Sequence, residues 1–119
     1  MTQSLYERMG GAQGIRRLVD DLVELHCKNP IIRARFQKTD LERLREKGRE
    51  FFAMGTGGPA NYTGKDMREA HKGMNISEQE FVAVLDDILA AMDKNKLGDQ
   101  EKREVLAIAY SLKAEVIRV

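Results

Sequence analysis

Apolar residues recur at intervals of three and four along most of the chain, which is the spacing of one face of an α-helix. The clearest case is a helix expected from about Ala12 to Lys28. Its apolar stripe consists of Ile15, Leu18, Val19, Leu22, Val23 and His26. Asn29-Pro30 ends this helix, because proline disfavours helical geometry in the residue before it. No segment shows the alternating pattern of a strand, so the sequence predicts an all-α fold.

Three pairs of residues have the spacing of a capping box, in which a serine or threonine and a glutamate three residues later cap a helix start. The pairs are Ser4 with Glu7, Thr39 with Glu42, and Ser77 with Glu80. Gly10-Gly11 breaks the first of these helices, and Gly98-Asp99 precedes a final one. The helix after Thr39 has an expected inward face of Leu41, Leu44, Gly48, Phe51 and Phe52. The helix after Ser77 has Phe81, Val84, Leu85, Ile88, Leu89 and Met92. The final helix has Val105, Ile108, Ala109, Leu112 and Val116.

Between these helices lies a segment that a simple bundle does not explain. A long glycine-rich loop, Gly55 to Gly64, leads to a short helix that carries His71 and closes at Gly73. This helix is poor in apolar residues, so it buries little surface and needs another anchor. An iron–histidine bond would provide one. The alternative is a plain helical bundle, whose apolar stripes need no cofactor.

Composition narrows the class of protein. The chain has 119 residues, so we expect one domain, residues 1–119. Charged residues make up 33% with a net charge of +1, and this balance argues against nucleic-acid binding. The single cysteine, Cys27, excludes an internal disulfide and is typical of a reducing compartment. No apolar run has the length of a membrane span and no signal-peptide pattern is seen, so we expect a cytoplasmic protein without a membrane partner.

Three glycine and histidine motifs are similar to those of a known family. They are Gly10-Gly11, Gly57-Gly58-Pro59 and the segment from Tyr62 to His71, which reads YTGKDMREAH. With them the chain resembles the truncated haemoglobins of group I, and the resemblance runs from Leu5-Tyr6-Glu7 to the final helix. It implies a truncated globin, a two-over-two helical sandwich, with haem as the cofactor. We expect haem b, because the chain has no Cys-x-x-Cys-His attachment motif.

The resemblance makes His71 the proximal iron ligand. Its Nε2 binds iron, while the other ring nitrogen donates to a backbone carbonyl or a similar acceptor. The resemblance also places Phe36 on the face of the haem. Met67, one turn before His71, is expected to pack under the porphyrin, because thioethers fill irregular gaps well. Arg68 and Lys65 either pair with a propionate or are solvated surface charges. The residues expected to contact the haem are Phe36, Leu44, Lys47, Gly48, Phe51, Met67, Arg68, His71, Val84 and Ile88.

On the opposite, distal side the chain departs from the family. Val23 stands where many members have a tyrosine, Gly48 where they have a glutamine, and Leu44 at the distal-histidine position of other globins. None of the three can donate a hydrogen bond. A charge-directed hydrogen bond contributes roughly 1.5–3 kcal/mol, so its loss implies a ten- to hundred-fold weaker hold on O₂, on the order of that energy. CO depends much less on such a donor. We therefore expect an unusually apolar distal pocket.

Two polar residues leave alternatives open on this side. Lys47 occupies the position where some members carry a histidine as a sixth iron ligand, and the small Gly48 leaves room for its stem to fold inward. Lys47 either binds iron as a neutral amine or extends to solvent beside a propionate. His26 lies on the inward stripe one turn after Val23. It is either a core residue with one satisfied hydrogen bond, or a distal ligand or water-mediated donor to the gas.

The sequence thus supports three functional hypotheses. The first is a haem protein that binds O₂, CO or NO, for O₂ transport or NO handling, including NO dioxygenation with a reductase as electron donor. The second is a six-coordinate haem protein in redox work, with Lys47 or His26 as the sixth ligand. The third is a haem-free helical interaction domain. We expect a monomer or weak dimer in each case.

Overall fold

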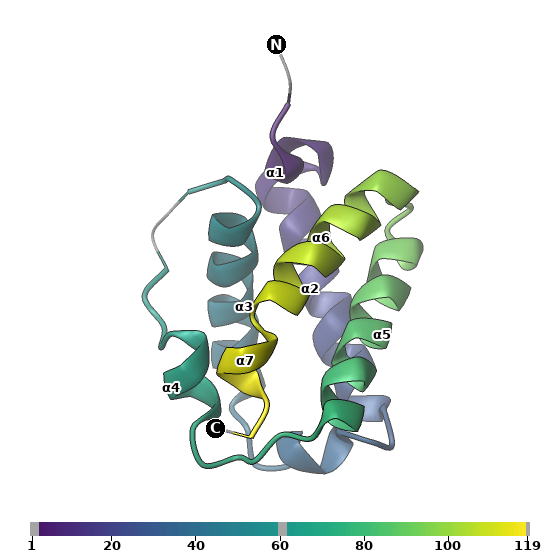
Figure 1. Cartoon of the computed structure of the whole chain (residues 1–119). Helices are drawn as coiled ribbons and strands as arrows, with labels where there is room; N and C mark the ends of the chain where they lie inside the picture. The colour runs from purple at the N-terminus through teal and green to yellow at the C-terminus, as the bar shows by residue number, and fades with distance from the viewer. Residues whose placement is uncertain (1–2, 60–61, 119) are drawn as a thin grey trace.

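Helices account for the regular structure of residues 3–59 and 62–118, the part of the chain that the computed structural model describes (Figure 1). In chain order they are α1 Leu5–Arg8, α2 Gly11–Lys28, the 3₁₀ helix η1 Arg33–Phe36, α3 Leu41–Gly55, α4 Met67–His71, α5 Glu78–Lys94, α6 Asp99–Ser111 and α7 Lys113–Val116. Within these described ranges the extended pairing is limited to an isolated bridge between Ile76 and Ile117.

The long helices form two layers. Helix α2 packs against both α3 and α5, and α5 also contacts α6. Figure 1 shows α6 crossing in front of α2, with α3 and α5 on either side. The whole stripe expected on α2 is buried, and Ile15, Leu18 and Val19 are each 1% exposed. These residues join Met92 of α5 and Val105 of α6 in the main core. The predicted all-α fold is therefore confirmed.

Two of the three predicted helix starts are confirmed and one is wrong. Capping boxes at Ser4 and Ser77 begin α1 and α5. Helix α3, however, is capped by Asp40, whose carboxylate accepts a hydrogen bond from the backbone N–H of Arg43 at 3.2 Å. Thr39 instead donates its hydroxyl to the carbonyl of Arg35 at 3.3 Å. The helix begins one residue later than expected because Asp40 supplies the stronger, charged acceptor.

The final helix is also not continuous, contrary to the expectation. It breaks at Leu112, and α7 turns to pack against α4. The break brings Val116 into a second apolar cluster with Ile76 and Phe81. The backbone N–H of Arg118 then donates to the carbonyl of Ile76 at 3.0 Å. Contacts distant in sequence therefore fix the end of this helix, and they give the short helix α4 a neighbour.

The corner between α1 and α2 depends on Gly14. A Cβ atom at this position would lie 1.9 Å from the carbonyl oxygen of Met9, which is part of the rigid backbone. Gly10, which precedes α2, has a φ of +100°, a conformation that favours glycine. The two glycines together let α1 fold tightly against the start of α2.

We predict that Gly14→Ala lowers the free energy of unfolding by about 2 kcal/mol, although alanine favours helices, because the added methyl group forces the corner apart. Gly55→Ala is the matched control, since an added Cβ there meets no atom within 4 Å. It should leave stability unchanged or raise it by up to about 1 kcal/mol. Urea denaturation measures both. A Gly14→Ala protein as stable as the wild type would contradict the steric argument.

Candidate functional site

A cavity of about 700 Å³ lies between the helices, and all the α-helices except α1 contribute to its described lining. Protein interiors are close-packed and leave few voids larger than a water molecule. Ligand-binding sites measure roughly 300–1,000 Å³ and are mostly apolar. The size of this cavity and its largely apolar walls are therefore those of a binding site for a sizeable apolar ligand.

His71 lies on the wall that α4 provides. Asp66 caps this helix by accepting from the backbone N–H of Glu69 at 2.8 Å. The Nδ1 atom of His71 is 2.7 Å from the carbonyl oxygen of Met67, one turn earlier. A carbonyl can only accept, so Nδ1 carries the proton and Nε2 keeps its lone pair. The partly buried imidazole can thus offer Nε2 as a metal ligand.

The other walls are mostly apolar. Helix α2 contributes Val19, Leu22, Val23 and His26, α3 contributes Leu44, Gly48, Phe51 and Phe52, and α5 contributes Val84 and Ile88. Phe36, Lys47, Met67 and His71 also line the cavity. Every residue expected from the sequence to contact a haem, except Arg68, therefore lines this space. Arg68 is exposed on α4 and is not part of the lining.

Gly48 is where α2 and α3 approach closely. A Cβ atom at this position would lie 3.1 Å from Cγ1 of Val19. A side chain at this position would therefore displace Val19, although Gly48 itself lines the cavity. In this conformation the stem of Lys47 does not fold inward beside Gly48, because its Nζ lies at the hydroxyl of Thr63.

Lys47 is held by the loop that follows α3. Its Nζ donates to the hydroxyl of Thr63 and lies 3.8 Å from Oε2 of Glu50. Glu50 Oε1 accepts from the backbone N–H of Thr63 at 2.9 Å and from its hydroxyl at 2.7 Å. These hydrogen bonds, the backbone one most strongly, lower the pKa of Glu50. We call Lys47, Glu50 and Thr63 the α3 clasp, because they tie the loop before α4 to the cavity wall.

A buried polar network lies at the α2–α5 contact. Nδ1 of His26 is 2.7 Å from Oδ2 of Asp87, and Nδ2 of Asn29 donates to both carboxylate oxygens at 3.2 Å. The His26 ring stacks on Phe36, with centroids 5.6 Å apart. Burial lowers the pKa of His26, and the hydrogen bond to Asp87 opposes this only in part. Sequence reasoning missed Asp87. The available clue was that Asp87, a charged residue, lies on the same apolar helix face as Val84.

Three exposed cationic side chains are among the residues that line the cavity, namely Arg35, Arg43 and Lys65. Arg35 forms an ion pair with Glu80, and its Nη2 donates to Oε1 at 3.0 Å. This guanidinium lowers the pKa of Glu80 to about 2. Arg43 and Lys65 line the same cavity as exposed residues, and neither forms an ion pair within the described ranges. Arg43 was not expected from the sequence. Its position four residues before Lys47, on one edge of α3, was the available signal.

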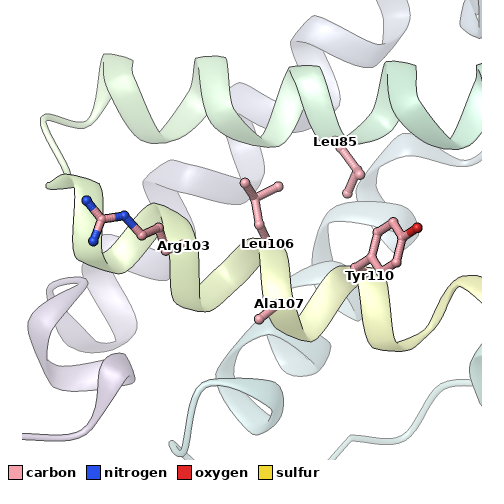
Figure 2. Close-up of a pocket in the computed structure, with 5 residues that line it drawn as sticks. All are labelled: Leu85, Arg103, Leu106, Ala107 and Tyr110. Carbon is pink, nitrogen blue, oxygen red and sulfur yellow. The ribbon is translucent and has the colours of Figure 1, made fainter.

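A second, shallower depression lies on the outer face of α5 and α6. Its lining consists of Leu85, Arg103, Leu106, Ala107 and Tyr110 (Figure 2). Figure 2 shows Leu85 extending from α5 towards α6, while Leu106 extends from α6 towards α5. Leu85 also lines the large cavity, so it is the residue common to both.

None of the helices in the described part of the chain combines the length and apolar character needed to cross a membrane. No group of three or more histidine, cysteine, aspartate or glutamate side chains in the same part of the chain could hold a bare metal ion.

The fold and the site together define a class. A two-over-two helical sandwich around an apolar cavity, with a histidine on one wall, is the arrangement of a small globin. The family model of bacterial-like globins matches residues 4–117, and the chain belongs to this family. It is a truncated haemoglobin of the group I type, as the sequence motifs predicted.

Individual relatives agree with this assignment. The group 1 truncated hemoglobin of Synechocystis sp. is 30% identical over 110 residues, covering 89% of each chain. That of Tetrahymena pyriformis is 26% identical over 115 residues, covering 97% of this chain and 95% of the relative. A crystal structure of the Tetrahymena pyriformis truncated hemoglobin in its Fe(III) form superposes with a TM-score of 0.95, covering 98% of this chain and 100% of the other at 26% identity. Membership of the globin family implies haem-based binding of diatomic gases.

The ion pair between Arg35 and Glu80 yields a prediction about pH. Because the folded-state pKa of Glu80 is lowered, its contribution is present above the ordinary value of 4.5 and is lost as pH falls towards about 2. Arg35→Met should lower the free energy of unfolding by about 1 kcal/mol at neutral pH. The difference from wild type should shrink as pH falls below 4.5.

Urea denaturation between neutral and acidic pH measures this effect. Arg33→Met is the matched control, because Arg33 is an exposed arginine in the same 3₁₀ helix with no ion pair in the described part of the chain. An equal loss for Arg35→Met at neutral and at acidic pH would show that the arginine acts through packing and not through charge.

Proposed function

We propose that the cavity holds haem b, with Nε2 of His71 as the proximal ligand, and that the chain binds O₂, CO or NO on the opposite, apolar side. The observation that carries this proposal is the state of His71. The carbonyl of Met67 fixes the proton on Nδ1, at 2.7 Å, and leaves the lone pair of Nε2 on a ring that lines the cavity. A haem bound here supplies an iron ion with one position for a histidine and one for a gas.

The lining fits a haem in size and chemistry. The volume of about 700 Å³ is large enough, and its apolar walls suit a porphyrin. The carboxylate groups of a haem need cationic partners, and Arg43 and Lys65 line the cavity as exposed residues without an ion pair among the described residues. The Fe(III) form of the Tetrahymena relative supports an iron cofactor for this chain as well.

The distal wall favours gas binding over NO dioxygenation. Val23, Leu44 and Gly48 line the cavity, and none of their side chains can donate a hydrogen bond. Dioxygenation needs O₂ that stays bound until NO arrives, so it depends on a donor that these three positions lack. The chain is therefore better suited to ligands that need no donor, such as CO and NO.

The other two hypotheses have less support. A six-coordinate site with Lys47 requires its Nζ to leave the α3 clasp and to lose its proton before it can bind iron. A haem-free interaction domain would be expected to fill its own core, whereas this chain leaves about 700 Å³ between its helices.

We predict that His71→Ala loses normal haem retention and that added imidazole restores it, because the small molecule can supply the missing ring nitrogen. Haem titration and the Soret absorbance of the ferrous-CO form measure this outcome. Lys72→Ala, an exposed neighbour beyond α4, is the control and should retain haem as the wild type does. Unchanged haem affinity and an unchanged ferrous-CO spectrum in His71→Ala would refute the assignment.

We also predict that Val23→Tyr slows O₂ dissociation roughly ten- to hundred-fold, because the phenol supplies the absent hydrogen-bond donor. Val23→Phe adds the ring without the hydroxyl group, so it separates the effect of the donor from that of size. Flash photolysis and stopped-flow mixing give the rates. If both variants change the rate equally, the wild-type pocket is not limited by a missing donor.

A further inference from the structure

His26 is a buried ionisable group in the cavity wall, and the proposed haem site does not require it. The residue is 8% exposed, as is Asp87, its partner from α5. A buried carboxylate is costly unless its oxygens accept hydrogen bonds. Asp87 receives them from His26 and from Asn29. The pair of His26 and Asp87 is thus a hydrogen-bonded, buried part of the α2–α5 contact.

Asn29 fixes these directions. Its side-chain oxygen accepts from the backbone N–H of Ile31 at 3.0 Å, so its NH₂ group faces Asp87 and donates. An ionised carboxylate can only accept, and therefore Nδ1 of His26 must be the other donor. Burial lowers the pKa of His26, which favours the neutral ring at neutral pH, and the contact with Asp87 places the one proton of that ring on Nδ1. Its Nε2 atom is then an acceptor with a free lone pair.

Nε2 of His26 forms no hydrogen bond among the described residues. It is also not one of the fully buried side-chain nitrogens without a partner, which are Nε of Arg8 and Nε of Arg49 in the described part of the chain. His26 lines the cavity, and the ring that stacks on it, Phe36, lines the same space. We therefore infer that the unpaired nitrogen is reached from the cavity, on the α2 wall that also carries Val23.

We propose that Asp87 and Asn29 fix His26 as a hydrogen-bond acceptor on the distal side, so that the site favours small ligands that carry their own S–H, N–H or O–H donor. This inference rests on the haem function proposed above and names a ligand class for it. Ligands that can only accept meet a lone pair instead of a donor. The other lining residues of the α2 wall are Val19, Leu22 and Val23, so this one group sets the polarity that a ligand encounters on that wall.

The network itself offers a way to reverse this polarity. In Asp87→Asn, Asn29 still directs its NH₂ group at position 87, so the new amide turns its oxygen to Asn29 and its own NH₂ to His26. Nδ1 must then accept, and the proton moves to Nε2. The same substitution gives the wrong histidine tautomer in the catalytic triad of serine proteases. Asp87→Asn therefore converts the acceptor into a donor without adding or removing a ring.

Two measurements test the proposal on the haem-loaded protein. Nitrogen-15 NMR of the diamagnetic ferrous-CO form should show the His26 proton on Nδ1 in the wild type and on Nε2 in Asp87→Asn. The ferric affinities for hydrogen sulfide, which can donate, and fluoride, which can only accept, are then compared by absorption titration. Asp87→Asn should weaken hydrogen sulfide and strengthen fluoride binding, each roughly ten-fold for one hydrogen bond.

His26→Phe gives an independent test, because it keeps a ring against Phe36 and removes Nε2. It should weaken hydrogen sulfide binding roughly ten-fold without the gain for fluoride that Asp87→Asn produces. Asp86→Asn is the matched control, since it makes the same charge change at an exposed neighbour of Asp87 and should alter neither affinity.

Three results would overturn the proposal. They are a wild-type proton on Nε2, hydrogen sulfide and fluoride affinities that change in parallel, and a low-spin ferric spectrum that His26→Phe removes, which would make Nε2 an iron ligand. A chain with no Soret band after reconstitution would instead refute the haem function on which the proposal rests. If Asp87→Asn does not fold, the wild-type tautomer and His26→Phe still decide the question.

Discussion

The rest of the structure depends on one constraint, which is that a chain of 119 residues stays folded around an internal space of about 700 Å³. The apolar walls of such a space lack the packing contacts that side chains make in a filled core. The fold therefore makes sense with an occupant that restores the missing contacts, and stability and ligand binding are coupled.

This coupling bears on the elements that bury little surface of their own, which are α4, the loop before it and η1. Helix α4 buries little of its own surface, so it relies on the neighbouring α7, on the cap at Asp66 and on whatever His71 binds. The loop before it is tied to α3 through Thr63. Arg35 and Glu80 join η1 to α5. Polar links thus supplement the small apolar cluster of Ile76, Phe81 and Val116, which is the apolar packing available to this part of the wall.

The sequence predicted what local chemistry decides. The stripe on α2 and the boxes at Ser4 and Ser77 depend on residues within one or two turns, and the structure has them as expected. The Asp40 cap was missed because Thr39 and Asp40 could each cap α3. The two choices move the start of the helix by only one residue. The break at Leu112 was missed because its cause is the distant packing of α7 on Ile76.

In the candidate site, too, some features follow from local sequence and others from contacts between distant residues. Its lining residues lie on helix faces that periodicity identifies, whereas the partner of His26 is 61 residues away on α5 and no local pattern points to it. Inspection of Val23, Leu44 and Gly48 gives a pocket without donors, which is correct for those side chains. It does not give the polarity of the α2 wall, because that polarity depends on which nitrogen of His26 holds the proton. That proton is placed by Asp87, and Asp87 is in turn oriented by the amide of Asn29. A residue that does not line the cavity thus determines what the cavity offers to a ligand.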